Sequence, residues 1–179
     1  MNGSKGLLVV IFGVFLALGV AFPAPAADQV TRAVAMVQPA SGSSVSGVVY
    51  FAQFERGVAV LAEITGLTPG LHGFHIHEFG DCSGPEATTA GGHYNPRGVS
   101  HGCPPSWPIH AGDLGNLNAD DSGTATFYRI FHHLRLDGPE SILGRGVVVH
   151  AGEDDCVSQP SGAAGARVGC GTIGIRPPE

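Results

Sequence analysis

Lysine is almost absent from this chain, since Lys5 is the only one among its 179 residues. Beyond Lys5 the positive charges are all arginines, and fifteen acidic residues bring that part of the chain to a net charge near −7. Without a basic stripe, nucleic acid is excluded as a partner. Aromatic residues are few, at 7%, and no segment keeps a helical period of 3.6 over three turns. These absences exclude an architecture built on amphipathic helices.

Long apolar runs are also missing, with one exception at the N-terminus. Leu7–Phe22 follows Lys5 and leads into Pro23-Ala24-Pro25-Ala26, with small residues at the A-x-A spacing. This order predicts a secretory signal peptide over residues 1–26, with an uncleaved anchor as the alternative. The folded domain is then expected over residues 27–179, secreted to a periplasmic or extracellular compartment and without stable membrane association after cleavage.

Glycine is abundant, with 28 residues, and apolar residues occur in short runs broken by Gly, Pro and Asp. Such runs predict an all-β antiparallel sandwich or barrel. Two long irregular stretches, 79–109 and 152–167, are expected to be functional loops. Eight runs are predicted as strands: 30–38, 45–51, 58–64, 70–78, 110–118, 123–131, 146–151 and 168–175.

Seven residues have the chemistry and spacing of a two-metal site: His75, His77, His93, His101, His110, Asp113 and His150. On a strand, His75 and His77 point to one face because side chains alternate. Three histidines with one carboxylate suit zinc, and three or four histidines with an open position suit copper. Six histidines serve both sites if one of them bridges.

Four cysteines remain in a chain predicted to be secreted: Cys82, Cys103, Cys156 and Cys170. An even count in an oxidising compartment predicts two disulfides, and the sequence allows three pairings.

Five segments carry a family resemblance, in the order in which the family has them. The chain resembles the copper-zinc superoxide dismutases in Gly73–Asp81 (GFHIHEFGD), Gly91–Pro96 (GGHYNP), His110–Asn116 (HAGDLGN), Gly146–His150 (GVVVH) and Gly165–Ile175 (GARVGCGTIGI). The resemblance covers nearly all of the expected domain. It implies an eight-stranded antiparallel Greek-key barrel or sandwich and the dismutation of superoxide to oxygen and hydrogen peroxide, as antioxidant defence outside the cytoplasm.

The resemblance also implies one copper and one zinc ion per subunit. Copper would be held by His75, His77, His93 and His150, and zinc by His93, His101, His110 and Asp113. His93 would bridge the two ions and deliver a proton. Arg167 would hold the anionic substrate, and Asp154 would connect a copper histidine to a zinc histidine.

The resemblance implies a disulfide between Cys82 and Cys170. Cys103 lies two residues after His101, and Cys156 lies two residues after Asp154. If Asp154 bonds the ring of His101, these two cysteines lie close together, so we predict a second disulfide. Intermolecular pairing or a free thiol is the alternative.

The expected partners are superoxide, a second copy of the chain in a possible homodimer, and an unidentified source of copper. The alternative function is a non-catalytic copper-binding or copper-delivery protein of the same fold. The remaining histidines, His72, His132 and His133, are expected to be structural or exposed residues rather than ligands.

Overall fold

A computed structural model describes residues 29–177, and its only helix is a single 3-10 turn, Thr88–Ala90. The predicted signal peptide, residues 1–26, lies outside the described residues. Within 29–177 no helix is long and apolar enough to cross a membrane. The strands are β1 (Arg32–Pro39), β2 (Ser46–Phe54), β3 (Gly57–Thr65), β4 (Gly70–His77), β5 (Asp113–Ala119), β6 (Ala125–Phe131), β7 (Gly146–His150), β8 (Arg167–Thr172) and β9 (Gly174–Ile175).

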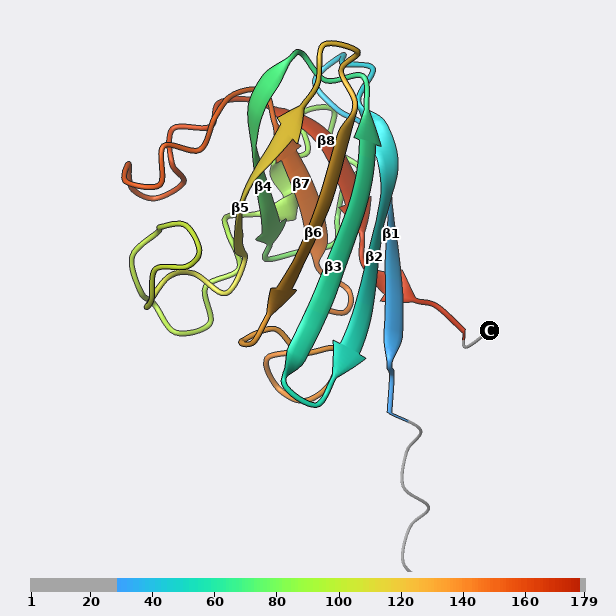
Figure 1. Cartoon of the computed structure of the whole chain (residues 1–179), viewed down its shortest axis with the longest axis vertical. Helices are drawn as coiled ribbons and strands as arrows, with labels where there is room; N and C mark the ends of the chain where they lie inside the picture. The colour runs from blue at the N-terminus through green and yellow to red at the C-terminus, as the bar shows by residue number, and fades with distance from the viewer. Residues whose placement is uncertain (1–28, 178–179) are drawn as a thin grey trace, which may run out of the picture.

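The strands form one antiparallel sheet in the order β5-β4-β7-β8-β1-β2-β3-β6, and β9 pairs with β1. The two ends of this order, β5 and β6, approach each other, so the sheet curls into a nearly closed barrel (Figure 1). The predicted all-β antiparallel fold is confirmed. One predicted strand, 168–175, is divided in two, because buried Ile173 turns into the core and β9 leaves β8 to pair with β1.

Alternation along the strands builds the core inside the barrel. In β1, Ala33, Ala35 and Val37 are buried within it, and in β4 the inward side chains are Phe74 and Ile76. A strand that puts Phe74 and Ile76 inside must put His75 and His77 on the outer side. These histidines are nevertheless buried, so the two long loops must cover the outer face of the barrel wall there.

The loop between β4 and β5 is attached to that wall by a small second core. Ala87 and Ala90 of the loop pack on Val148 of β7 and Cys170 of β8. The disulfide between Cys82 and Cys170 links the same two layers. The predicted start of a strand at His110 is wrong by three residues: β5 begins at Asp113, after a turn in which Asp113 N–H donates to His110 O.

Candidate metal centre

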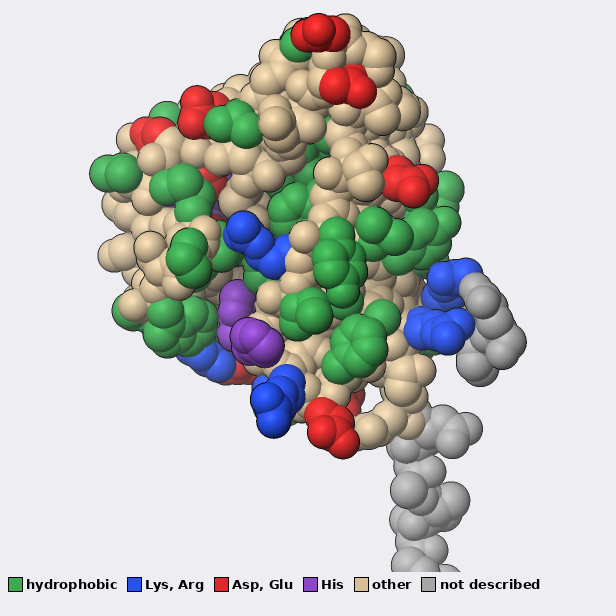
Figure 2. Space-filling view, viewed as in Figure 1, with side chains coloured by type: hydrophobic (Ala, Val, Ile, Leu, Met, Phe, Trp, Pro, Cys, Tyr) green, Lys and Arg blue, Asp and Glu red, His purple; other side chains and the backbone are tan. Residues whose placement is uncertain are grey.

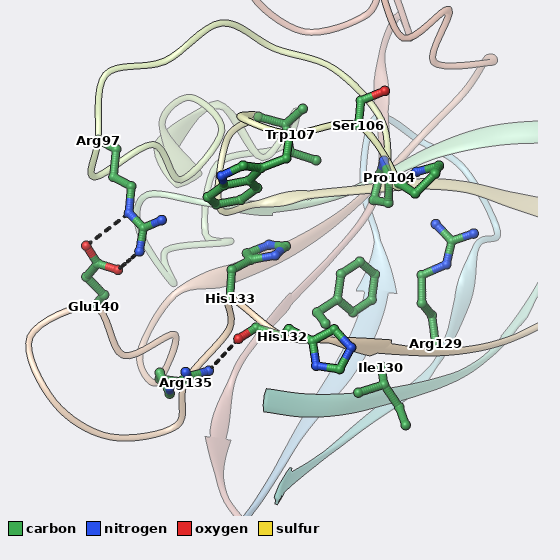
Figure 3. Close-up of a pocket in the computed structure, with 13 residues that line it drawn as sticks. Arg97, Pro104, Ser106, Trp107, Arg129, Ile130, His132, His133, Arg135 and Glu140 are labelled. Carbon is green, nitrogen blue, oxygen red and sulfur yellow. Dashed lines mark hydrogen bonds and ion pairs between the residues drawn. The ribbon is translucent and has the colours of Figure 1, made fainter. Parts of the chain in front are cut away.

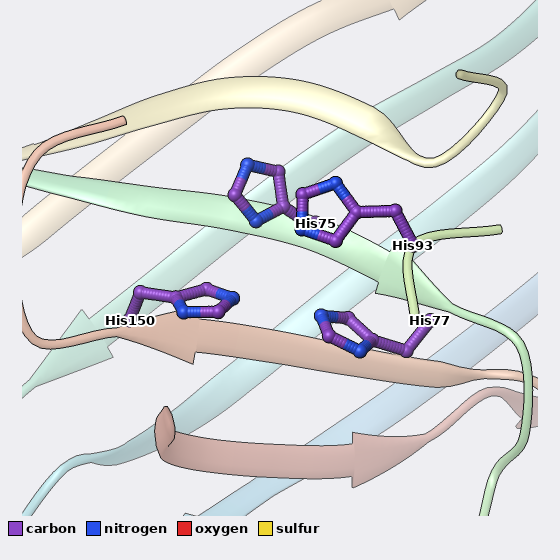
Figure 4. A group of neighbouring side chains, drawn as sticks. All are labelled: His75, His77, His93 and His150. Carbon is purple, nitrogen blue, oxygen red and sulfur yellow. The ribbon is translucent and has the colours of Figure 1, made fainter. Parts of the chain in front are cut away.

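Four histidines gather on the outer face of β4 and β7 (Figure 4). His75 and His77 come from β4, His150 ends β7, and His93 comes from the long loop, where it bridges to His77. Two register shifts, between Phe74 and His75 and between Val149 and His150, occur at the first and last of these residues. One ring nitrogen from each histidine lies within 4.8 Å of the others.

Hydrogen bonds fix which nitrogen each ring turns toward the cluster. His77 Nδ1–H donates to Gly91 O at 2.9 Å, and His150 Nδ1–H donates to Gly165 O at 3.0 Å. His75 Nε2–H donates to Asp154 Oδ2 at 2.8 Å. Each bond leaves the other nitrogen of the ring as a lone-pair donor aimed at the common centre.

Those other nitrogens have no protein partner although they are buried. They are His75 Nδ1, His77 Nε2, His93 Nε2 and His150 Nε2. A buried polar atom without a hydrogen bond is costly, and four such atoms turned toward one point are the signature of a metal site. An all-imidazole set of this kind fits copper.

A second cluster adjoins the first and contains His93, His101, His110 and Asp113. Asp113 Oδ1 lies 2.9 Å from His93 Nδ1, 3.0 Å from His101 Nδ1 and 3.3 Å from His110 Nδ1. Tetrahedral zinc with bonds of about 2.0–2.1 Å separates its ligand atoms by about 3.3 Å. The Nδ1 atoms of His101 and His110 are buried and make no hydrogen bond, so the set fits zinc better than a hydrogen-bonded cluster.

His93 belongs to both clusters through its two ring nitrogens. Its Nδ1 faces Asp113, whereas its Nε2 is unpartnered and faces the all-histidine cluster. Its ring centroid lies 3.9 Å from that of His75 and 5.7 Å from that of His110. A single imidazole in this position can join two metal ions.

Asp154 connects the two clusters by a second route. Its Oδ2 accepts from His75 Nε2 at 2.8 Å, and its Oδ1 accepts from His101 Nε2 at 2.9 Å. The carboxylate is buried. Because each ring donates one nitrogen to Asp154, its other nitrogen is committed to a metal cluster.

Two amide side chains fix the backbone of Asp154 and His101 by hydrogen bonds, and the sequence patterns did not single out either of them. Asn116 Nδ2 donates to Asp154 O, and Asn116 Oδ1 accepts from Asp154 N–H, at 2.9 and 2.8 Å. Gln159 makes the same paired contact with the backbone of His101, at 2.8 and 3.0 Å. Asn116 occurs within a quoted motif, whereas no pattern in the sequence marks Gln159.

Arg167 begins β8 beside the all-histidine cluster. Its guanidinium donates to Ala87 O at 2.6 Å and to Gly91 O at 2.7 Å. Gly91 O also accepts from His77, so the arginine and a cluster histidine share one carbonyl. The side chain is half-buried, which leaves a cation at the edge of the cluster for an incoming anion.

Two disulfides fasten the loops around the site, Cys82–Cys170 and Cys103–Cys156. The second joins the loop that carries His101 to the loop that carries Asp154. Cys156 N–H also donates to Asp154 Oδ1 at 2.7 Å. The described residues contain no free cysteine.

The three remaining histidines lie outside both clusters. His72 is buried, and its Nδ1–H donates to His150 O at 2.8 Å, so it supports the backbone of a cluster residue without entering the site. His132 and His133 bond the carbonyl oxygens of Arg56 and Ala111.

Burial controls the protonation of the all-histidine cluster. It lowers the pKa of His75 from its usual 6.5 to about 4, although the hydrogen bond that His75 donates to Asp154 acts to raise that pKa. Burial, with the charge of neighbouring His75, lowers the pKa of His150 to about 3. At neutral pH these rings are therefore uncharged and ready to bind a metal ion.

His101 behaves in the opposite way. Burial favours its neutral form, but the hydrogen bonds and charges of Asp113 and Asp154 outweigh burial and raise its pKa to about 9. Two carboxylates in contact with the His101 ring favour a positive charge on or beside that ring. In the metal-free protein a proton on His101 supplies it, and zinc binding has to displace that proton.

These shifts predict a stability maximum for the metal-free protein near pH 6.5. Between pH 6.5 and about 4 the unfolded chain binds more protons at His75 and His150, so the free energy of unfolding falls as pH falls, by up to about 1.4 kcal/mol per pH unit per group. From pH 6.5 to about 9 the raised pKa of His101 works the other way, and stability falls as pH rises. Urea unfolding in excess chelator measures both slopes, and a flat profile would contradict the prediction.

The fold and the two clusters define a class of protein: a β-barrel metalloprotein whose neighbouring copper-type and zinc-type sites share one histidine. Residues 45–173 match the family model described as copper/zinc superoxide dismutase. The chain is 43% identical over 155 residues to "Extracellular superoxide dismutase [Cu-Zn]" of Onchocerca volvulus, an alignment that covers 80% of this chain and 76% of the relative. The chain belongs to the copper/zinc superoxide dismutase family.

Proposed function

We propose that this protein converts two superoxide ions and two protons into oxygen and hydrogen peroxide. The single observation that carries the proposal is the set of buried, unpartnered ring nitrogens in two clusters that share His93. Family membership and a relative named as an extracellular superoxide dismutase support it. They favour an enzyme over a copper-delivery protein, as do the complete ligand set and Arg167.

The predicted ligands remain our assignment. Copper would be held by His75, His77, His93 and His150, and zinc by His93, His101, His110 and Asp113. Copper supplies one-electron redox chemistry at this position, and zinc supplies a fixed positive charge. Both cofactors are those of the family, and the donor types of the two clusters fit them.

The side chains around the clusters have separate tasks. Arg167 attracts and orients superoxide, because a guanidinium stays charged and offers a planar set of donors. His93 carries a proton on Nε2 to the product when that nitrogen is not bound to metal. Asp154 keeps the His75 and His101 rings in the orientation that ligation needs.

We also propose a location and an assembly. The extracellular relative and the two disulfides support secretion, and we assign residues 1–26 as a cleaved signal peptide and 27–179 as the enzyme domain. A homodimer is supported by exposed large apolar side chains on two paired strands, Met36 on β1 and Ile175 on β9.

The test of the function combines metal analysis with turnover. The purified protein is expected to hold one copper and one zinc per subunit and to dismutate superoxide rapidly in pulse radiolysis or stopped-flow measurements. Arg167→Gln is expected to lower kcat/KM by about tenfold, because a charge-assisted contact to the anion is lost, while metal content stays the same. Arg129→Gln, which removes a charge from β6, a strand without any predicted metal ligand, serves as the control.

Full copper loading with slow turnover would instead support the copper-delivery alternative. Loss of metal in Arg167→Gln would mean that this arginine holds the site together rather than the substrate.

A further inference from the structure

A large pocket lies outside the metal centre, between β6 and the 104–109 segment of the long loop (Figure 3). Its volume is about 850 Å³, within the range of small-molecule binding sites. None of the predicted metal ligands lines it. Superoxide, a diatomic ion, is too small to fill such a space, so dismutation does not account for the pocket.

One wall of the pocket is flat and apolar. Trp107, the only tryptophan of the chain, is 55% exposed there, and Pro104 and Pro105 of the same segment line the pocket with it. The indole is supported by its neighbours: the His133 ring centroid lies 5.3 Å away, and the Arg97 guanidinium lies 5.4 Å from the ring. A large, supported and still exposed aromatic surface suits a ring-containing ligand.

The pocket also concentrates positive charge in an acidic chain. Arg97, Arg129 and Arg135 line it, with Glu140 as the one acidic residue of the lining. Figure 2 shows basic and histidine side chains beside apolar ones on this face. With a net charge of −6 over the whole chain, three arginines at one pocket indicate an anionic ligand.

Of these three arginines, only Arg129 is free to bind. Arg97 is paired with Glu140 at 2.8 Å, and Arg135 donates to the carbonyl oxygens of His132 and Leu134 at 2.8 and 2.7 Å. Among residues 29–177, no hydrogen bond or ion pair is made by the Arg129 guanidinium, which Figure 3 draws reaching across the pocket toward Pro104.

We propose that this pocket binds a flat, ring-containing organic anion. The ring packs against Trp107 beside Pro104, and the carboxylate or sulfonate receives the planar donor pair of Arg129. The pocket is preformed, because the contacts of Arg97 and His133 hold the indole in place without a ligand. The proposal goes beyond superoxide dismutation and does not depend on it.

The test uses the one tryptophan as a reporter. The metal-loaded protein, with copper kept reduced by ascorbate, is titrated with 2-naphthoate while the Trp107 indole N–H resonance is followed by NMR. The neutral analogue 2-naphthamide has the same ring without the charge. We expect saturable shifts, with naphthoate binding at least tenfold more tightly than naphthamide.

Arg129→Gln is expected to raise the Kd for naphthoate about tenfold, since it removes a charged hydrogen-bond donor. The Kd for naphthamide and the dismutase rate should not change. Arg56→Gln, which removes the same charge from an exposed turn that does not line the pocket, should leave both values as in the wild type.

Three results would overturn the proposal. They are shifts that do not saturate, equal effects of Arg129→Gln and Arg56→Gln, and an indole resonance that moves with protein concentration before any probe is added. The last would mean that a second copy of the chain fills the pocket. Because the titration contains no superoxide, its failure would leave the proposed dismutase function untouched.

Discussion

Replacement of Asp154 by asparagine is expected to weaken zinc binding by about 10- to 100-fold. Asp154 accepts from His75 and His101 at the same time. An asparagine has only one oxygen and presents an NH₂ group to the other ring, so one of the two rings must turn or lose its partner. The change also removes one of the two carboxylates that favour a cation at His101. Competition with a chelator of known affinity measures the zinc Kd.

The matched control is Asp121→Asn, which makes the same change of charge in the hairpin turn between β5 and β6 and should leave the zinc Kd unchanged. Copper binding is expected to weaken less than zinc binding in Asp154→Asn, because three other copper histidines keep their own partners. A zinc Kd within twofold of the wild-type value would mean that Asp154 does not orient the His101 ring.

Removal of the Cys82–Cys170 disulfide is expected to have the largest effect on stability. The bridge joins residues 88 positions apart, and closing a loop of that length is worth about 4–5 kcal/mol in the chain-entropy model. Loss of the bridge also removes the covalent link that holds Ala87 and Ala90 of the long loop against β7 and β8. Cys82→Ser/Cys170→Ser should therefore lower the free energy of unfolding of the metal-free protein by about 4 kcal/mol in urea titrations.

The other disulfide provides the comparison. Cys103–Cys156 spans 53 positions, so Cys103→Ser/Cys156→Ser should cost a similar amount in the same model. The functional consequences should differ. Loss of Cys82–Cys170 loosens the loop whose carbonyls hold Arg167, and lowers kcat/KM. Loss of Cys103–Cys156 loosens the contact between the His101 and Asp154 loops, and lowers zinc retention. Equal effects of both variants on zinc retention would contradict this division.

The prediction of the fold from the sequence depended on alternation, which is a local property. Runs such as Val58–Ile64 and Gly123–Phe131 correspond closely to β3 and β6, because β-branched and aromatic residues that alternate with smaller or polar ones suit a half-buried sheet. The errors occurred where long-range contacts decide. Residues 168–175 read as one run, yet Ile173 turns inward and releases β9 to pair with β1.

The chemistry of the metal centre was also visible in the sequence. The i, i+2 spacing puts His75 and His77 on one face of a strand, and the presence of Asp113 among histidines indicates zinc. The fold places all seven predicted ligands in two adjoining clusters. The number of cysteines predicted two disulfides, although it left three pairings open.

By itself, then, the sequence determined the class of fold, the donor atoms of the metal centre and the need for disulfides, because these follow from residue type and spacing along one strand or loop. Only the tertiary structure decided which nitrogen of each ring faces which cluster, since that depends on carbonyl and carboxylate partners from other segments. It also revealed the supports at Asn116 and Gln159. The pocket at Trp107 and Arg129 was likewise visible only in the tertiary structure, because its walls come from segments that are separate in the sequence and that the barrel brings together.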